Sequence, residues 1–371
     1  MTQPAPFDIF LVTAPGLEAM LCAELVAKGF AGPVAQSGGV TIKGGWSDVW
    51  RANLEIRGAS RVLARIGSFH AVHLSQLDKL ARRFPWGEVL RPDVPVRVDA
   101  SSKRSKIYHA GAAAQRIETA IREELGAEIS ADAAVQVRAR LEDNLCTLSI
   151  DTSGELLHKR GYKQAVAKAP MRETLAALFL RQCGYDGTEP VLDPMCGSGT
   201  FIIEAAEIAA GLAPGRERDF AFEHLVGFDS QAWEAMRAPR APRETDLRFY
   251  GSDRDAGAIR VARDNAERAG VSHLTEFQQC PVSELEAPEC EPGLVIINPP
   301  YGTRIGNKTA LQGLYRGLGK TLMTRFSGWR VGLVTTEVSL AKATRLPFGA
   351  PGPYIDHGGL KVRLFATGVL G

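Results

Sequence analysis

The chain has 371 residues, of which 45% are hydrophobic and 23% are charged, and its net charge at pH 7 is +2. This composition is typical of a folded, soluble protein and excludes a disordered chain. The near-neutral charge excludes the general basicity of a histone-type nucleic-acid binder, so any polyanion would have to bind at a local patch. At roughly 150 residues per domain, we expect two or three domains.

The cysteines and the N-terminus restrict the compartment. The six cysteines are scattered without a Cys-x-x-Cys pair, which argues against a zinc site and a disulfide framework. The first ten residues lack the order of a secretion signal, and no apolar run reaches the roughly 18 residues of a membrane span. We therefore expect a cytoplasmic protein that does not enter membranes, and we take a monomer as its state.

The first 55 residues form one predicted module. Residues 7–12 alternate like a strand, and helical spacing follows the Pro15-Gly16 turn as far as Gly29. Residues 38–44 resemble a second strand and residues 46–56 a short amphipathic helix. The pattern indicates a compact α+β module over residues 1–55.

Residues 56–164 continue as a second α+β unit of strands and helices. Its most informative stretch is the loop "SSKRSKIYH", which places Lys103, Arg104 and Lys106 among serine hydroxyls just before a helix. Cations, hydroxyls and helix-start amides together suit phosphate oxygens. The commoner explanation of three neighbouring cations is a solvated basic turn, so the loop alone does not establish nucleic-acid binding.

A third domain is predicted from about residue 165 to residue 371. It opens with a helix that ends at Gly184, and strands and helices then alternate strictly. This order is typical of a mostly parallel sheet with crossover helices. The expected strands are 190–194, 247–253, 294–300, 329–337 and 360–368, with helices at 199–211 and 255–270.

The stretch "VLDPMCGSGT" joins the first strand of this domain to a glycine loop and a helix. It is neither a dinucleotide fingerprint nor a P-loop, because the third glycine and the Gly-Lys-Ser/Thr are missing. The stretch resembles motif I of class I S-adenosylmethionine-dependent methyltransferases that act on exocyclic base amines. The resemblance implies that Gly197 and Gly199 lie along the methionine part of the cofactor and that Asp193 faces its ammonium group.

Two later positions extend the expected cofactor site. By the same resemblance Asp253, after the next strand, would contact the ribose, whereas Asp255 is more simply a helix N-cap. Cys280 stands where similar enzymes commonly have an adenine-binding Asp, and a thiol is a poor acceptor, so Gln279 or backbone could replace it. The complete predicted set is Asp193, Pro194, Cys196, Gly197, Ser198, Gly199, Thr200, Asp253, Asp255 and Cys280.

The motif "NPPY", residues 298–301, follows an apolar strand that the prolines must end. It resembles the fingerprint of methyltransferases whose target is an amine conjugated to a planar ring. Such an amine needs acceptors for its protons as positive charge develops, here the Asn298 side-chain oxygen and the Pro299 carbonyl, worth ~10²- to 10³-fold in rate. The resemblance adds Pro300 as a constraint and Tyr301 as a stacking surface for a flipped base.

The whole chain resembles RNA guanine-N2 methyltransferases with an N-terminal ferredoxin-like domain (1–55) and a THUMP domain (56–164). Residues 211–236 resemble an insertion found in the bacterial enzymes that methylate 23S ribosomal RNA. The resemblance implies S-adenosylmethionine without a metal, a seven-stranded Rossmann-like domain, and RNA contacts by Lys103, Arg104, Lys106, Arg160 and Lys163.

Three alternatives remain open on the sequence. A tRNA guanine or an adenine N6 amine could be the target, since the NPPY geometry suits each of them. The chain could also be a non-catalytic RNA-binding protein with a vestigial methyltransferase fold. The intact glycine loop and NPPY motif argue against that last alternative, and only Cys280 favours it.

Overall fold

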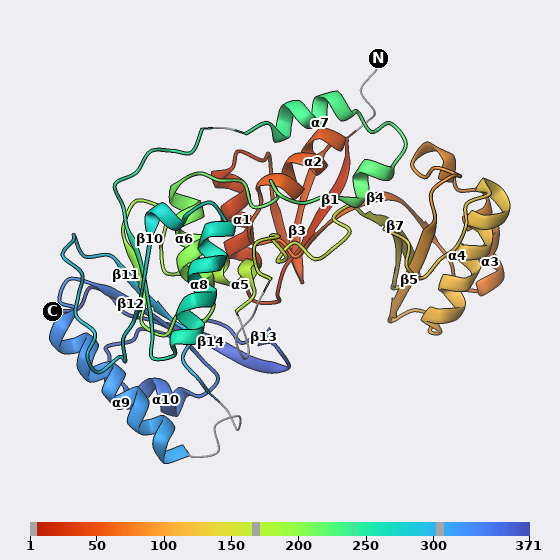
Figure 1. The fold of residues 1–371 in the computed structure, drawn as a ribbon. Helices are drawn as coiled ribbons and strands as arrows, with labels where there is room; N and C mark the ends of the chain where they lie inside the picture. Colours follow the sequence, from red (N-terminus) through yellow and green to blue (C-terminus); the bar gives the residue numbers. More distant parts are fainter. Residues whose placement is uncertain (1–5, 165–170, 240, 302–307) are drawn as a thin grey trace. The chain divides into compact units, whose positions relative to one another are not determined.

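The computed structural model describes residues 6–164, 171–239, 241–301 and 308–371, coloured along the chain in Figure 1. The chain forms two compact units. The first comprises Met1–Thr13, Cys22–Leu157 and Gly215–Pro239, and the second comprises Ala14–Leu21, His158–Pro214 and Arg240–Gly371. In the described part of the chain no helix has the length and apolar character needed to span a membrane.

The first unit is built on a seven-stranded sheet in the order β2-β3-β1-β4-β7-β6-β5. Its long strand β4 pairs with β1 through residues 61–64 and with β7 through residues 63–70. The two predicted N-terminal modules therefore share one continuous sheet. The strands are β1 (Phe7–Val12), β2 (Val34–Gln36), β3 (Gly39–Gly44), β4 (Arg61–His70), β5 (Val96–Lys103), β6 (Val135–Glu142) and β7 (Leu145–Asp151).

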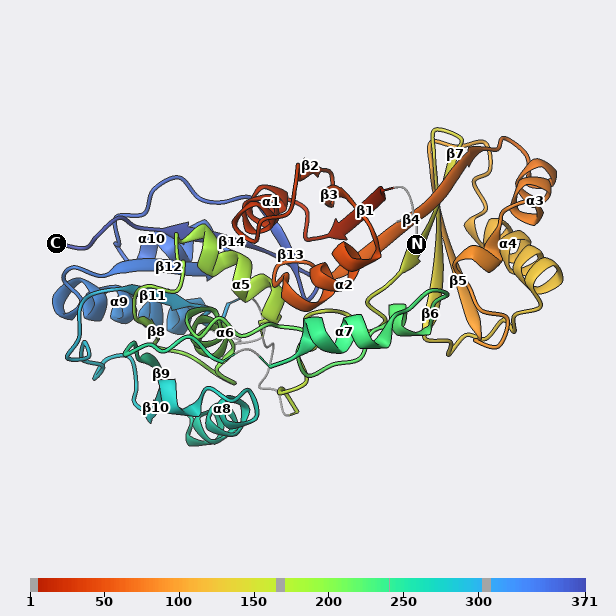
Figure 2. The same cartoon turned by 90° about the horizontal axis from the view of Figure 1, so that it is seen from above.

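The helices of this region are α1 (Glu18–Ala27), α2 (Trp46–Glu55), α3 (Leu74–Arg82), α4 (Ala110–Leu125) and α7 (Ser230–Arg237), with 3₁₀ turns η1 (Trp86–Glu88) and η2 (Ala221–His224). Helix α4 ends at Gly126, which has a left-handed φ of 82° as helix caps often do. Its buried residues Ala113, Ile117, Ala120 and Ile121 recur at helical spacing. Figures 1 and 2 show α3 and α4 side by side against the β5 end of the sheet.

The segment Gly215–Pro239 belongs to the first unit although it lies inside the range expected for the third domain. Phe222 stacks on Trp50 of α2 with ring centroids 6.0 Å apart and meets Trp233 edge-on at 5.0 Å. Arg218 donates hydrogen bonds to the carbonyls of Ser153, Glu155 and Leu156 after β7. The first unit is therefore completed by chain from both sides of the glycine loop. The boundaries at residues 55 and 164 stay a prediction, and the start at 165 lies outside the described residues.

The second unit is a seven-stranded sheet in the order β10-β9-β8-β11-β12-β14-β13. The strands β10, β9, β8, β11 and β12 run parallel, and β14 is antiparallel to both β12 and β13. The strands are β8 (Val191–Asp193), β9 (Phe249–Asp253), β10 (Thr275–Gln279), β11 (Leu294–Ile297), β12 (Arg330–Thr335), β13 (Ile355–His357) and β14 (Leu360–Ala366). The mostly parallel sheet predicted from the alternation is confirmed.

Helices cover both faces of this sheet. Helix α9 packs four apolar or aromatic residues against Val295 and Ile297 of β11 and against β12, and α10 lies beside it (Figure 1). Helices α5 and α6 pack together, and Cys183 at the end of α5 reaches the opposite face beside Gly332. The helices are α5 (Glu173–Gln182), α6 (Thr200–Ala209), α8 (Ala256–Arg268), α9 (Lys308–Arg325), α10 (Val338–Ala343) and the 3₁₀ turn η3 (Ser272–Leu274). No signal used in the sequence analysis predicted α9.

The aromatic cluster of the first unit gives a stability prediction. Phe222 is 1% exposed, so Phe222→Ala leaves a cavity among Trp50, Phe220 and Trp233 and should lower the free energy of unfolding by ~3–5 kcal/mol. Val226, in the same segment, is 38% exposed, and Val226→Ala is the matched control with a loss of less than ~1 kcal/mol. Urea unfolding followed by tryptophan fluorescence compares them. Equal losses would show that the segment is not part of the core.

Candidate active site

The chemistry-bearing motifs meet at the carboxyl edge of the parallel strands β8, β9 and β11. Ligands of open α/β sheets bind in the crevice at this edge. A cavity of about 1520 Å³ lies there. Twelve of the residues predicted from the sequence line it: Asp193, Pro194, Cys196, Gly197, Ser198, Thr200, Asp253, Asp255, Asn298, Pro299, Pro300 and Tyr301.

The glycine loop needs glycine for its backbone angles and, at Gly199, also for the close packing around it. Gly197 and Gly199 both have left-handed φ values, 53° and 82°, which side chains other than glycine rarely adopt. A Cβ on Gly199 would also lie 3.2 Å from the Ala262 Cβ and from the Phe277 ring. Gly199 begins α6 and does not line the cavity, so its part is to let the helix approach the sheet.

Asp193 places a buried carboxyl group in the lining of the cavity. Its side chain is 2% exposed, and one oxygen accepts a hydrogen bond from the Met195 amide at 3.0 Å. Burial raises the pKa of Asp193 to about 8, although the Met195 amide opposes the shift. A cation in the cavity would favour the ionised carboxylate.

Asp253 connects two loops at this edge. One carboxylate oxygen accepts from the Gly197 amide at 3.1 Å and the other accepts from the Asp255 amide at 3.0 Å. Each carboxylate oxygen can accept a second hydrogen bond, so the group can still bind a pair of hydroxyls. Asp255 accepts from the Gly257 amide at 2.7 Å as the N-cap of α8, which confirms the simpler of its two predicted roles.

Gln279, the last residue of β10, and Cys280 after it stand where we expect adenine recognition, but neither lines the cavity. Cys280 does not line the cavity, and burial raises the pKa of its thiol. Gln279 is exposed and donates from its amide to the Arg254 carbonyl at 3.1 Å. The cavity wall is instead formed by the next residues, Pro281, Val282 and Ser283. A role for Cys280 toward the cofactor stays a prediction.

The NPPY motif leaves a fully buried strand and turns into the cavity. All four residues of β11 are buried, and Asn298 follows directly. The side-chain oxygen Oδ1 of Asn298 is buried and has no hydrogen-bond partner among the described residues. A buried acceptor without a donor is unfavourable by about 1–3 kcal/mol, which a ligand N–H would relieve. Pro299 is buried and Tyr301 is half-buried beside it.

The two basic residues predicted near the domain junction are internal. Arg160 is 4% exposed, and its Nε lies 3.1 Å from a Glu204 oxygen on α6. The Lys163 ammonium donates to the Thr200 hydroxyl at 2.8 Å and lies 3.2 Å from a Glu173 oxygen. Buried ion pairs of this kind fix the chain around α6, and this placement does not favour RNA contact by either side chain.

The basic loop before α4 is exposed but partly neutralised. Arg104 has a left-handed φ of 50° and donates to Glu142 and Asp143, each at 2.9 Å. Lys103 lies 3.8 Å from the same Glu142. Lys106 is exposed, and its backbone amide is held by the Asn144 side chain. The loop is therefore a fixed turn whose cations face both solvent and carboxylates.

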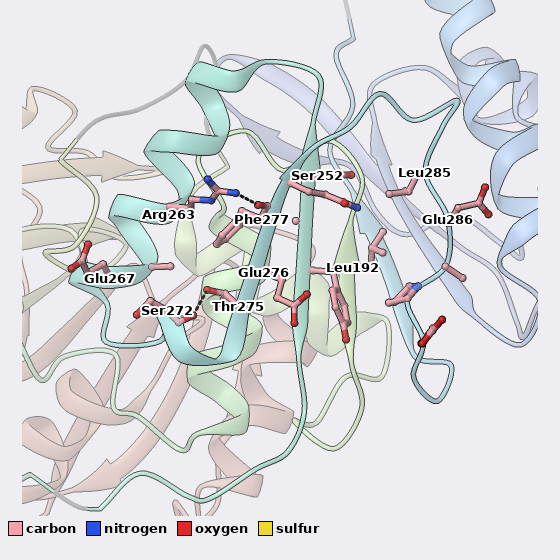
Figure 3. Close-up of a pocket in the computed structure, with 17 residues that line it drawn as sticks. Leu192, Ser252, Arg263, Glu267, Ser272, Thr275, Glu276, Phe277, Leu285 and Glu286 are labelled. Atoms are coloured by element: carbon pink, nitrogen blue, oxygen red, sulfur yellow. Dashed lines mark hydrogen bonds between the residues drawn. The ribbon is translucent and has the colours of Figure 1, made fainter.

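A second cavity of about 940 Å³ flanks the edge strand β10 in the second unit (Figure 3). Arg263 and Phe277 lie on one side of the strand, with the Arg263 guanidinium bonded to the Phe277 carbonyl, whereas Leu192, Leu285 and Glu286 lie on the other. None of the predicted site residues lines this cavity. The chemistry therefore belongs to the first cavity.

The structure adds residues that the sequence analysis missed. Arg172, Arg254 and Arg260 line the first cavity and are exposed, and Tyr315 of α9 contacts Pro300. The arginines carry no sequence signal, since isolated cations are common on surfaces. Thr335, whose hydroxyl lies beside that of Tyr315, is the last residue of β12. The rule that ligand sites gather at the carboxyl ends of strands could have predicted this residue.

Two family models match the chain. The RMKL-like methyltransferase domain matches residues 160–347, and the RlmL ferredoxin-like domain matches residues 8–63. Together with the sheet order, these matches confirm the predicted fold, a class I methyltransferase domain preceded by a ferredoxin-like domain. S-adenosylmethionine is accordingly the cofactor.

Two curated relatives cover most of the chain. The ribosomal RNA large subunit methyltransferase K/L of Syntrophotalea carbinolica is 36% identical over 91% of this chain and 50% of its own length. A Synechocystis protein provisionally named as an RNA methyltransferase is 31% identical over 96% of this chain and 95% of its own. The chain thus spans about half the length of the K/L relatives but nearly all of the Synechocystis protein.

Two solved structures share the complete fold. One, from Listeria monocytogenes, is described as a predicted N6-adenine-specific DNA methylase, with 31% identity, a TM-score of 0.88 and coverage of 98% of this chain and 96% of its own. The other, a provisionally assigned methyltransferase complexed with SAH, has 27% identity, a TM-score of 0.89 and coverage of 100% and 99%. The chain belongs to the family of the RMKL-like methyltransferase domain.

Proposed function

We propose that this protein transfers a methyl group from S-adenosylmethionine to the N2 amine of a guanine in RNA, with 23S ribosomal RNA as the substrate. The observation that carries the proposal is the Asn298 oxygen, which is buried without a hydrogen-bond partner in the described part of the chain and belongs to a residue that lines the same cavity as the glycine loop. A methyl donor and an amine that both enter this cavity would meet at its strand edge.

The cavity fits both the cofactor and a base. Its volume of about 1520 Å³ exceeds the roughly 300–1,000 Å³ of a typical small-ligand pocket. The buried Asp193 carboxyl suits the ammonium group, and the Ser198 hydroxyl oxygen, which is buried without a hydrogen-bond partner among the described residues, offers another polar contact. Asp253 retains the lone pairs that a ribose needs, because each of its oxygens accepts only one hydrogen bond from the backbone.

The chain's own residues orient the target amine. The cofactor supplies an electrophilic methyl group, so no metal or strong base is needed before transfer. The Asn298 oxygen and the Pro299 carbonyl would accept hydrogen bonds from the two amine N–H groups while the new N–C bond forms and the old S–C bond breaks. The positive charge on nitrogen is then lost with a proton to solvent. Tyr301 would stack on the unstacked base.

The first unit would hold the RNA. We propose that residues 56–164 act as a THUMP domain, with Lys103, Arg104 and Lys106 near phosphate oxygens of a structured RNA. The exposed arginines at the cavity, among them Arg172 and Arg254, add cations where a strand would approach the site. The names of the K/L relatives support ribosomal RNA as the substrate.

A second candidate is an adenine N6 amine, which the description of the Listeria structure favours. The same pair of acceptors would serve that amine, so the motif does not distinguish the two bases. A guanine in tRNA is a third substrate with the same chemistry. Nucleoside analysis of the methylated RNA distinguishes all three, since it separates methylguanine from methyladenine and 23S RNA from tRNA.

The first prediction concerns Asn298. Asn298→Ala should lower kcat for methyl transfer ~10²- to 10³-fold because one acceptor of the developing charge is lost. Cofactor affinity should change little, since the glycine loop is untouched. Tritium transfer from labelled S-adenosylmethionine to RNA from a strain lacking the gene measures the rate, and calorimetry with S-adenosylhomocysteine measures binding. Equal incorporation by both proteins would refute the proposed role of Asn298.

The second prediction concerns the charge of Asp193. The pKa of the Asp193 carboxyl in the free protein is raised to about 8. Below pH 8 this carboxyl must therefore lose a proton before it can pair with a cationic ammonium group. Affinity for S-adenosylhomocysteine should therefore rise by up to ~10-fold per pH unit from pH 6 to 8 and then level off. Methylthioadenosine lacks the ammonium group and should show no such rise. A rise that persists in Asp193→Asn would assign it to another group.

The same carboxyl should destabilise the ligand-free protein. Its folded pKa lies above the unfolded value of ~3.9, so the unfolded state ionises first and stability falls between about pH 4 and pH 8. Asp193→Asn should therefore raise Tm at pH 8 by at least ~2 °C without ligand, in a thermal scan. The exposed Asp246→Asn is the matched control and should leave Tm unchanged. A lower Tm for Asp193→Asn would contradict the prediction.

The basic loop gives a further prediction. Reversing Lys103, Arg104 and Lys106 to Glu should weaken RNA binding and reduce the slope of log affinity against log salt by up to ~3. A control with the exposed Lys43, Lys79 and Arg91 reversed to Glu makes the same charge change elsewhere in the first unit. Filter binding over 50–200 mM salt compares the two. Equal weakening by both triples would show a general charge effect and no patch.

A further inference from the structure

We propose that Tyr315 and Thr335 form a positioning pair that fixes the NPPY turn and aims its acceptors at the target amine. The inference rests on the proposed methyl transfer at Asn298. It concerns two hydroxyl groups that do not themselves line the cavity.

The contacts place both hydroxyls behind the turn. The Tyr315 hydroxyl donates to the Pro300 carbonyl at 3.3 Å and lies 3.2 Å from the Thr335 hydroxyl oxygen. A phenol carries one proton, so Thr335 donates to Tyr315 when Tyr315 donates to Pro300. The result is a short chain of hydrogen bonds from the end of β12 to the turn.

Both members of the pair are held rigidly. Tyr315 is 0% exposed within the apolar cluster of α9, β11 and β12, and Thr335 is 0% exposed as the last residue of β12. The β11–β12 register pairs Ile297 with Leu333, so β12 continues for two residues, to Thr335, beyond the last paired residue of β11. Thr335 is therefore carried by a regular strand and Tyr315 by a regular helix, and neither lies in a loop.

Because the two prolines are consecutive, this hydrogen bond also restricts the direction of the Pro299 carbonyl. The φ of Pro300 is fixed by its ring, so the direction of its carbonyl decides the remaining angle of that residue. Asn298 and Pro299 each precede a proline and are restricted to extended conformations. The hydrogen bond to the Pro300 carbonyl thus restricts the last free backbone angle of this short stretch. With Asn298 and Pro299 already restricted, the backbone presents the Pro299 carbonyl and the Asn298 side chain in one orientation.

The phenol stays protonated in this setting. Burial raises the pKa of Tyr315, and the Thr335 hydroxyl opposes the shift less strongly. Tyr315 is therefore a donor throughout the neutral and mildly alkaline range and does not serve as a base. Its part is to hold a carbonyl, which removes motion of the turn before the base arrives.

The test uses substitutions that remove one hydroxyl and keep the shape. Tyr315→Phe and Thr335→Val should each lower kcat ~10-fold, with the KM for RNA and the affinity for S-adenosylhomocysteine within twofold of wild type. The double variant should be no slower than about the worse single variant, since both act through one chain of hydrogen bonds. Thr335→Ser keeps the hydroxyl and should restore kcat.

Tyr185→Phe is the matched control. Tyr185 is also a buried residue of the second unit, and its hydroxyl donates to the Ala205 carbonyl of α6 at 2.8 Å and not to the turn. This variant should lose a similar amount of Tm as Tyr315→Phe but keep kcat. If Tyr315→Phe and Tyr185→Phe both lose kcat in proportion to their loss of Tm, the Tyr315 and Thr335 hydroxyls make ordinary core contacts and the inference is overturned.

A readout that does not depend on activity separates the inference from the proposed function. The ¹⁵N shift of the Tyr301 amide reports the hydrogen bond to the Pro300 carbonyl in the same peptide group and should move in Tyr315→Phe but not in Tyr185→Phe. An unmoved shift refutes the contact itself. If Asn298→Ala loses activity while Tyr315→Phe keeps it, the positioning inference fails and the function stands. If wild type transfers no methyl group to any RNA, the function fails even where the shift moves.

Discussion

The active site depends on one constraint, the abrupt end of a fully buried central strand. Strand β11 is paired on both sides by β8 and β12 and must stop where two prolines remove its backbone donors. The polar groups that follow it, the Asn298 oxygen and the Pro299 carbonyl, cannot be satisfied by a ladder. They are therefore available to a ligand, and the neighbouring strand ends supply the cavity that admits one.

The same edge carries a buried carboxyl group whose ionised form is unfavourable in the free protein. Asp193 is buried, and burial raises the pKa of its carboxyl to about 8, with a smaller contribution from the nearby Asp253 carboxylate. A side chain chosen for stability alone would be apolar or neutral at this position. A loss of stability is expected at a binding site where the opposite charge is supplied by the ligand and not by the protein.

The first unit shows a different dependence, between segments far apart in the sequence. Its aromatic cluster takes Trp50 from the N-terminal module and Phe222 and Trp233 from a segment that follows the glycine loop by about twenty residues. Neither segment can bury these rings alone. Folding of the first unit therefore requires chain that is interleaved with the methyltransferase sequence, so residues 1–157 do not contain its complete core.

The sequence by itself determined the local features. Strand and helix spacing, the end of a helix at Gly184, the Asp255 cap and the two motifs are set by residues within a few positions of one another. Long-range packing decided the rest. Arg160 and Lys163 read as surface cations but pair with Glu204 and Glu173, Asp253 ties two loops together, and Tyr315 and Thr335 reach the NPPY turn from another helix and strand. The Glu204 carboxylate that pairs with Arg160 is 44 residues away in the sequence, and local spacing gives no sign of such a partner. The register between two strands is equally invisible, because burial and pairing exist only once the sheet has formed.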